Sequence, residues 1–406
     1  MRYVNVEAKL TKHMLEPDGN ESKSSTSLAF KYWPTDPYWS FQLSRLLATS
    51  TYGGADFAEC HLAARKMQPG VVEDWVSGWI NLATNVRGMA DDALAAGFPV
   101  TARNGYLRAT NYFRAAEFFL QLQPPGTDEK RKEETYLACR KSFQLALPHL
   151  PHQVEIIEFP YQGSFLSAYF CHPLGNGPAP HRLIIFFGGS DSVAEELYFL
   201  AARAAVERGY AVLIVDGPGQ GASLRLRHIY SRPDYEVPVS AAVDYALTRP
   251  EVDPRRIALL ALSLGGYYAP RAAAFEKRLS ACIAWGIVYD AAAVNETYPL
   301  PDVMVPHFAR LFGTSSTTET LAVINQLKLK DIIGQIECPT LILHGEEDAL
   351  VPVAQAVQAF DGLRCDRTLR VFHRNEPGSL HCQFDSLTAA HSVMFDWLDM
   401  KLLLRF

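Results

Sequence analysis

Arg256-Ile-Ala-Leu-Leu-Ala-Leu-Ser-Leu-Gly-Gly266 is an apolar run that ends in a serine flanked by small residues. The run predicts a buried strand, and residues 267–276, which follow it at once, favour a helix. A strand, a sharp turn that carries a serine and a helix are the parts of a nucleophile elbow. Small residues at positions 261 and 265 suit this turn, because the strand and the helix approach each other closely there. The pattern usually has glycine where this chain has Ala261, so a plain Ser-Gly turn stays open as the alternative.

A catalytic serine needs a base and the base needs an acid, in the chain order Ser, then Asp or Glu, then His. Residues 339–348, Pro-Thr-Leu-Ile-Leu-His-Gly-Glu-Glu-Asp, predict a second buried strand that runs into an acidic loop. Asp348 stands where a triad acid is expected, at the carboxyl end of a late strand. Glu346 and Glu347 are the competing acids, but the spacing from the strand favours Asp348.

The candidate general base is His381. It follows both the serine and the acid, on a turn-rich loop after a predicted strand over residues 368–373. His344 and His373 lie within or at the ends of strands, and we expect them to be packed. We interpret Cys382, next to His381, as incidental, because Ser263 already fills the role of nucleophile.

An oxyanion hole is predicted after another strand, residues 181–187. Gly188 and Gly189 follow that strand, and glycines let backbone N–H groups turn toward a developing negative oxygen. We expect the donors to be the N–H of Leu264 and the N–H of Gly189 or of a neighbour. The alternative interpretation is a plain Gly-Gly turn.

Together these residues predict covalent hydrolysis. Ser263 attacks once His381 accepts its proton, Asp348 holds the imidazole, and water then hydrolyses the acyl-enzyme. The sequence has no metal-ligand spacing, and this mechanism needs neither a metal nor a cofactor.

The composition is that of an ordinary globular enzyme. The 406 residues are 48% hydrophobic and 20% charged, and the net charge of −6 gives no footprint for nucleic acid or an anionic membrane. We expect neither a membrane span nor a signal peptide. The seven scattered cysteines form no Cys-x-x-Cys pair and fit a reducing compartment, so we expect a cytoplasmic protein whose partner is a small-molecule substrate.

The chain is long for one core, which favours two domains. Residues 1–150 are predicted to form an N-terminal helical, cap-like domain, after a loose or strand-like lead over the first 30 residues. Further helices are expected over residues 101–122 and 128–147. Another helix is predicted before these two, because apolar residues recur at helical spacing at Trp75, Trp79, Leu82, Val86 and Met89.

Residues 151–406 are predicted to form an α/β-hydrolase catalytic domain. A hairpin over residues 155–170 comes first, and strands and helices then alternate, which predicts a mostly parallel, doubly wound sheet. Such sheets carry their sites at the carboxyl ends of strands. The alternation lapses over about residues 290–330, where we expect a lid insertion. The loop Gly217-Pro-Gly-Gln-Gly221 lacks the lysine and spacing of a phosphate-binding loop.

The chain resembles the serine hydrolases that include the FrsA-like esterases and 2,6-dihydropseudooxynicotine hydrolase. Its helical N-terminal part is similar to the same group, and especially to fungal polyketide-shortening hydrolases of pigment pathways. The resemblance covers about residues 30–400. It rests on the hairpin, the elbow and the segments Ala109–Tyr112, Arg114–Phe118, Phe187–Ser190, Asp216–Gly221, Val252–Ile257 and His344–Asp348.

The resemblance implies cleavage of a carbon–carbon bond in a 1,3-dicarbonyl compound by a retro-Claisen route, or of an ester bond, in a polyketide or aromatic secondary metabolite. Some relatives use an additional lid acid, for which Asp290 and Glu296 are the candidates here; the alternative for each is a solvated or helix-capping carboxylate. Relatives also suggest a homodimer. An acyltransferase or cyclase on the same scaffold stays open, because the triad is identical in both. A binding protein without turnover is disfavoured by the complete set of Ser263, Asp348 and His381.

Overall fold

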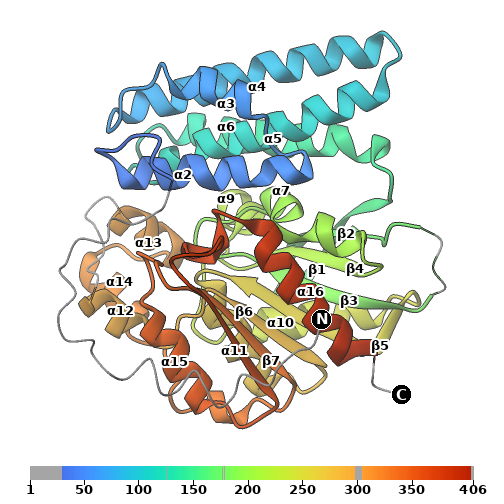
Figure 1. Cartoon of the computed structure of the whole chain (residues 1–406), viewed down its shortest axis with the longest axis vertical. Coiled ribbons are helices and arrows are strands. Elements are labelled where there is room, and N and C mark those ends of the chain that lie inside the picture. Colours follow the sequence, from blue (N-terminus) through green and yellow to red (C-terminus); the bar gives the residue numbers. More distant parts are fainter. Residues whose placement is uncertain (1–29, 125, 176, 178, 298–303, 404–406) are drawn as a thin grey trace.

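The structure is a computed structural model and describes residues 30–124, 126–175, 177, 179–297 and 304–403. The lead expected over the first 30 residues lies almost wholly outside the described residues. A layer of helices stands at one end of the molecule, over a twisted sheet with helices on both faces (Figure 1). Among the described residues, no helix combines the length and the apolar character that crossing a bilayer requires.

The sheet has eight strands in the order β1-β2-β4-β3-β5-β6-β7-β8. The hairpin β1–β2 is antiparallel, β2 also pairs antiparallel with β4, and the remaining pairs are parallel. The predicted hairpin and the predicted mostly parallel sheet are therefore confirmed. The strands are β1 (Val154–Tyr161), β2 (Ser164–Cys171), β3 (His181–Phe187), β4 (Ala211–Asp216), β5 (Val252–Leu262), β6 (Ala281–Trp285), β7 (Thr340–Gly345) and β8 (Arg367–Phe372).

The central strands are buried on both faces, which explains their unbroken apolar runs. In β3, Leu183, Ile185 and Phe187 pack on one face of the sheet. Ile184 and Phe186 pack on the opposite face. The helices around the sheet are α7 (Ala194–Leu197), α8 (Arg203–Val206), α9 (Gly221–Arg227), α10 (Glu236–Leu247), α11 (Gly265–Phe275), α15 (Val353–Gly362) and α16 (Leu387–Leu403). A π-helical turn, Tyr198–Ala202, joins α7 to α8.

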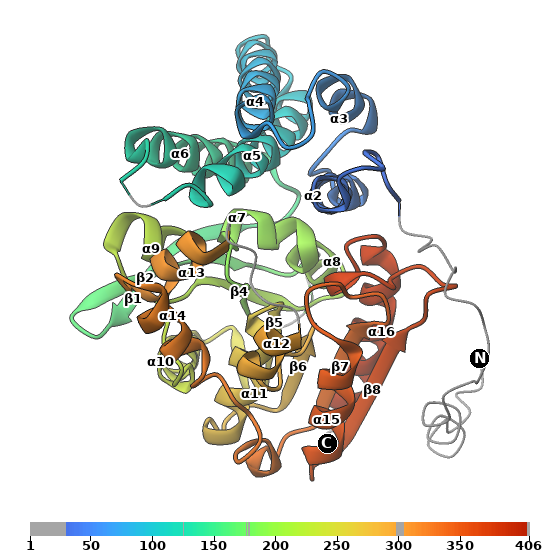
Figure 2. The ribbon, with the colours of Figure 1, turned by 90° about the vertical axis from the view of Figure 1, so that its left-hand side faces the viewer.

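The helical layer consists of α2 (Pro37–Ala48), α3 (Phe57–Ala64), α4 (Val72–Ala95), α5 (Pro99–Gln121) and α6 (Glu129–Ala146). It has an apolar core of its own, in which Trp75 and Trp79 are buried. Met89 is 59% exposed, because it lies at the margin of the apolar face of α4. Figure 2 shows the layer from a second side, again stacked on the sheet and its helices.

Three short helices occupy the expected lid region: α12 (Ala291–Thr297), α13 (Val305–Phe312) and α14 (Thr317–Ile324). The prolines at 299 and 301 lie outside the described residues. Helix α13 is held from two sides. Ser231 N donates to Leu311 O on the sheet side, and Arg310 pairs with Glu129 of α6 at 2.7 Å on the side of the helical layer.

Candidate active site

Ser263 stands between the end of β5 and the start of α11, in a left-handed backbone conformation with φ of 59°. A non-glycine residue in this region costs about 1–3 kcal/mol and persists only where its surroundings hold it. Here the N–H of Ser263 donates to Trp285 O at 2.8 Å, and the N–H of Gly266 donates to Ser263 O at 2.7 Å. The turn therefore lifts the serine side chain away from the strand.

The neighbours of Ser263 are small because the backbone is crowded there. A Cβ atom on Gly265 would lie 2.6 Å from Gly188 O and 2.8 Å from the Cβ of Ala261. The methyl group of Ala261 is fully buried. The turn thus accepts alanine two residues before the serine, provided that position 265 has no side chain.

His381 lies between Ser263 and Asp348. Its Nε2 is 2.9 Å from Ser263 Oγ, and its Nδ1 is 2.6 Å from Asp348 Oδ2. The second oxygen of Asp348 accepts hydrogen bonds from the N–H groups of Leu350 and Val351, at 2.9 and 2.8 Å. With Nδ1 protonated, His381 donates to the carboxylate and presents a lone pair to the serine hydroxyl.

The electrostatics of the pair make His381 a stronger base than an ordinary histidine. Burial would lower the pKa of His381, but the Asp348 carboxylate outweighs it and holds that pKa well above 6.5. Burial would likewise raise the pKa of Asp348, but His381 outweighs it and holds that pKa below its ordinary value. An imidazolium formed during reaction is therefore stabilised where it stands.

The competing acids lie apart from His381. Glu346 accepts from the backbone and guanidinium of Arg374, and Glu347 accepts from Ser379. His344 is fully buried and its Nε2 lies 2.9 Å from Val351 O, as its expected packing requires.

His373 is exposed, so its expected packing is wrong. It follows the last residue of β8, an edge strand, and therefore faces solvent. Cys382 is buried, with its Sγ 3.5 Å from Trp285 O.

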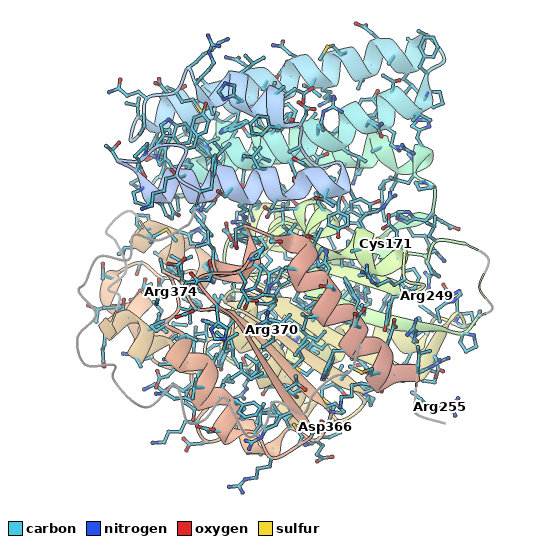
Figure 3. The ribbon with its side chains drawn as sticks, in the orientation of Figure 1. Cys171, Arg249, Arg255, Asp366, Arg370 and Arg374 are labelled. Atoms are coloured by element: carbon cyan, nitrogen blue, oxygen red, sulfur yellow. The ribbon has the colours of Figure 1, made fainter. Side chains whose placement is uncertain are left out.

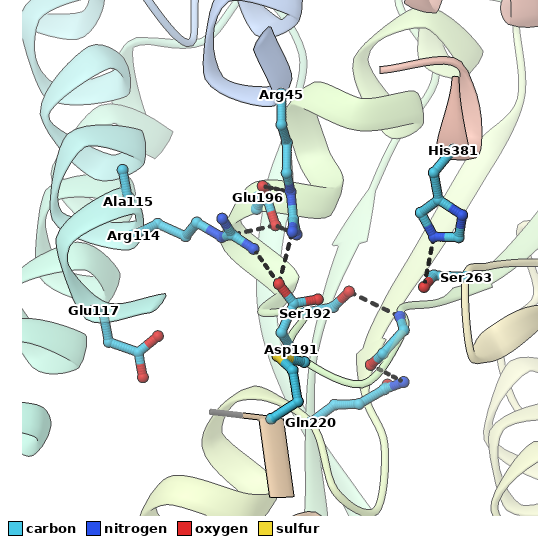
Figure 4. Close-up of polar contacts among 12 residues, drawn as sticks. Arg45, Arg114, Ala115, Glu117, Asp191, Ser192, Glu196, Gln220, Ser263 and His381 are labelled. Carbon is cyan, nitrogen blue, oxygen red and sulfur yellow. Dashed lines mark hydrogen bonds and ion pairs between the residues drawn. The ribbon is translucent and has the colours of Figure 1, made fainter. Parts of the chain in front are cut away.

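The glycine loop after β3, residues 188–192, lies beside Ser263 (Figure 4). A Cβ on Gly189 would lie 2.8 Å from the Cβ of Ser263. Gln220 Nε2 donates to Gly188 O at 2.6 Å and to Gly189 O at 3.2 Å. The N–H of Gly189 donates to Ser192 Oγ at 2.8 Å and is therefore already engaged.

The next N–H along this loop, that of Ser190, points away from Gln220. The Gly189–Ser190 peptide is trans, so its N–H is directed opposite to the Gly189 carbonyl that faces Gln220. Within the described part of the chain, neither Ser190 N–H nor Leu264 N–H has a hydrogen-bond partner. These two backbone donors are thus available beside the serine.

The comparison with protein families gives one match, to the family described as "Esterase FrsA-like", over residues 71–362. The chain belongs to the FrsA-like esterase family. The family model covers more than half of the chain, including Ser263 and Asp348 but not His381.

Several curated relatives of this FrsA-like protein are fungal hydrolases. Hydrolyase poxO of Penicillium oxalicum is 30% identical, with 90% of this chain and 97% of the relative covered. Hydrolase phmG of Phaeosphaeria nodorum is 36% identical, with coverage of 92% and 96%. The 20-hydroxy-prefusarin hydrolase FUS2 of Gibberella moniliformis is 30% identical, with coverage of 89% and 96%. The FrsA-like protein is accordingly a hydrolase.

Among solved structures, 2,6-dihydroxy-pseudo-oxynicotine hydrolase superposes with a TM-score of 0.75 at 26% identity, covering 89% of this chain and 95% of that one. The structure titled AbyA5 Wildtype superposes with a TM-score of 0.64 at 19% identity, covering 87% and 93%, which is a likeness of fold. These likenesses and the sheet order establish the predicted α/β-hydrolase fold.

Helix α2 lies against the candidate site of the FrsA-like hydrolase. The ring of Phe41 lies 6.4 Å from that of His381, and Tyr38 OH lies 3.7 Å from the Sδ of Met304, just before α13. A single helix of the N-terminal layer therefore contacts both the histidine and the start of α13.

The two candidate lid acids do not reach Ser263 through any contact in the described residues. Asp290 caps α12 by accepting from the N–H groups of Ala292 and Ala293. Glu296 is exposed. Among the described residues of this region, the buried titratable residue is His307 of α13, at 3% exposure, and its Nε2 has no hydrogen-bond partner in the described chain. No local sequence signal distinguishes it from the other histidines.

Among the described residues, one group has the spacing of metal ligands: Glu155, His172 and Glu251, whose ligand atoms lie within 4.8 Å of one another. The guanidinium of Arg249 already binds both carboxylates, each at 2.7 Å. Figure 3 labels Arg249 on the β1–β2 side of the sheet. Arg249 thus already bridges the two carboxylates of this cluster, which we interpret as part of the structure of the sheet edge.

Proposed function

We propose that Ser263, His381 and Asp348 form a catalytic triad that hydrolyses a carbon–carbon or ester bond in a polyketide or related aromatic metabolite. The observation that carries the proposal is the continuous chain of hydrogen bonds from Ser263 Oγ through His381 to Asp348. The named relatives support the substrate class, since one of them is a 20-hydroxy-prefusarin hydrolase.

In the carbon–carbon reaction, Ser263 Oγ attacks a ketone carbonyl of a 1,3-dicarbonyl unit while its proton passes to His381 Nε2. The carbonyl oxygen becomes negative in the tetrahedral intermediate. The bond to the neighbouring carbon then breaks, and this carbon leaves as an enolate that the His381 imidazolium protonates. Water activated by His381 attacks the acyl-enzyme and releases a carboxylate and free Ser263. With an ester the leaving group is an alkoxide, and the remaining steps are the same.

We assign the oxyanion donors to the N–H groups of Leu264 and Ser190. The engaged N–H of Gly189 argues for its neighbour, since Gly189 already donates to Ser192. Gly189 then contributes by its lack of a side chain, which lets the loop approach Ser263, and the lack of a side chain at Gly188 leaves room for Ser192 to turn back onto the loop. Donors of this kind act on the charge that develops in the transition state.

We also propose a division into a helical domain over residues 1–150 and a catalytic domain over 151–406, a homodimer, and a cytoplasmic location. Size-exclusion chromatography with light scattering tests the homodimer directly. Asp290 and Glu296 remain candidate auxiliary acids only if the lid rearranges on substrate binding.

The experiment that tests the proposal is product analysis by mass spectrometry in oxygen-18 water. The substrates are an acyl-aromatic 1,3-diketone and a matched aryl ester, with Ser263→Ala as the control. Labelled carboxylate from the diketone supports carbon–carbon hydrolysis, and label from the ester alone supports an esterase. A serine-dependent product without label would instead identify an acyltransferase or cyclase.

A further inference from the structure

A buried ion cluster joins the helical layer to the loop beside Ser263 (Figure 4). Asp191 Oδ2 lies 2.6 Å from Arg45 Nη1 and 2.8 Å from Arg114 Nη2. The same two guanidinium groups contact Glu196 Oε2, at 2.6 Å from Arg45 Nη2 and 2.9 Å from Arg114 Nε. Two cations from α2 and α5 thus meet two anions that follow β3.

The cluster is withdrawn from solvent. The side chains of Arg45, Arg114 and Glu196 are 5%, 6% and 3% exposed. Removing charges from water is costly, so a buried ion cluster is weak evidence for added stability. Guanidinium groups do, however, bind carboxylates in a fixed planar geometry, which makes such a cluster a positioning device.

The element it positions is the loop of residues 188–192. Asp191 is covalently next to Ser190, so anchoring its carboxylate from the helical layer fixes the following side of the Gly189–Ser190 peptide. Gln220 fixes the preceding side by donating to Gly189 O. The peptide plane is therefore held from both sides, and with it the direction of the Ser190 N–H.

Arg45 also touches the opposite wall of the site. Its guanidinium carbon lies 5.1 Å from the ring centroid of Phe384, three residues after His381. Arg45 of the helical layer therefore contacts the glycine loop at Asp191 and the loop of His381 at Phe384.

We propose that Arg45 and Arg114 are positioning residues for catalysis, which act through Asp191 to aim the Ser190 N–H at the oxygen of the reacting carbonyl. This inference rests on the proposed triad chemistry. It assigns the helical layer a part in transition-state stabilisation, in addition to covering the substrate.

The test compares Asp191→Asn with the wild-type enzyme, using an aryl ester substrate and a fluorophosphonate that labels reactive serine. The endpoint label counts folded sites with a working serine and histidine. For Asp191→Asn we expect full labelling, a nearly unchanged KM and a kcat per labelled site lowered about 10- to 100-fold. The loss of kcat is expected because removing an oxyanion donor lowers kcat by up to about 10³. Arg45→Lys, which keeps the charge but loses the bidentate contact, should show a smaller loss in the same direction and replaces Asp191→Asn if that variant does not fold.

The matched control is Glu117→Gln. It breaks the ion pair between Glu117 in α5 and Arg225 in α9, whose side chains are 2% and 7% exposed. This pair also joins the helical layer to the hydrolase part. We expect this variant to melt at a lower temperature with an unchanged kcat per labelled site. If Asp191→Asn and Arg45→Lys behave in the same way as Glu117→Gln, the cluster is only structural and the inference fails. If the wild-type enzyme takes up no label at Ser263, the proposed triad itself fails.

Discussion

Gly189 lies directly against Ser263, with no room for a side chain between them. A Cβ on Gly189 would lie 2.8 Å from Ser263 Cβ and 3.0 Å from Leu262 O. Both neighbours lie at the end of β5, where Ser263 N–H is hydrogen-bonded to Trp285 O, so we expect the loop to move instead.

Gly189→Ala should therefore lower kcat/KM of the aryl ester by about 10² or more, because displacing the loop removes an oxyanion donor. The control is Gly88→Ala in the exposed face of α4, where a Cβ would meet nothing within 4 Å. That change should raise the free energy of unfolding by about 0.5–1 kcal/mol without altering activity. Normal turnover in Gly189→Ala would show that the loop is not part of the site.

Ser263→Ala should lower turnover by about 10⁴ or more while the fold is retained, because the other groups cannot replace the nucleophile. The circular dichroism spectrum should match the wild type. The melting temperature should stay close to that of the wild type, because alanine keeps the left-handed backbone of position 263 and only the hydrogen bond to His381 is lost. A variant with near-normal activity would rule out the proposed mechanism.

Asp348→Asn should lower kcat by about 10³–10⁴, since the amide holds the wrong tautomer of His381. In the wild type, the pKa of His381 is raised, so kcat/KM should fall with decreasing pH and the inflection should lie above pH 6.5. The matched variant is Glu347→Gln, which leaves the contact between His381 and Asp348 intact. If Glu347→Gln is the more damaging change, the acid has been assigned to the wrong residue.

The buried His307 of α13 should make the protein less stable in acid. Burial lowers the pKa of His307 to about 4, from an ordinary 6.5, so the folded state binds fewer protons than the unfolded state between these values. The stability that the neutral, buried His307 contributes is fully present above pH 6.5. It is lost as the pH falls toward 4, and the free energy of unfolding then drops by up to about 3 kcal/mol. Urea unfolding at pH 7.5 and 5 should show a smaller loss of stability for His307→Gln than for the wild type. The exposed His228 supplies the control: His228→Gln should retain the full pH dependence.

Local signals in the sequence were sufficient for the sheet. Each central strand is an unbroken apolar run, and the predicted limits of β3 agree with the structure. The candidate residues Ser263, Asp348 and His381 were also readable, because each follows a strand and sheets of this kind place such ends together.

The contacts of the helical layer were not readable from the sequence. Arg45 and Asp191 are 146 residues apart, and neither belongs to a motif that would pair them. His373 was expected to be packed, but its exposure depends on β8 being an edge strand. The engagement of the Gly189 N–H depends on a turn that brings Ser192 back onto it. Each of these features is a property of the assembled fold.

Helix α2 contacts the histidine loop through Phe41, the approach to the lid through Tyr38 and the glycine loop through Arg45. The hydrolase half is therefore not a minimal enzyme to which a cap has been added. A truncation that begins after residue 150 would expose apolar surface and leave two buried acids without counter-ions. Chimeras that exchange helical layers between relatives, in order to change the substrate, would need to transfer residues 188–196 together with the layer.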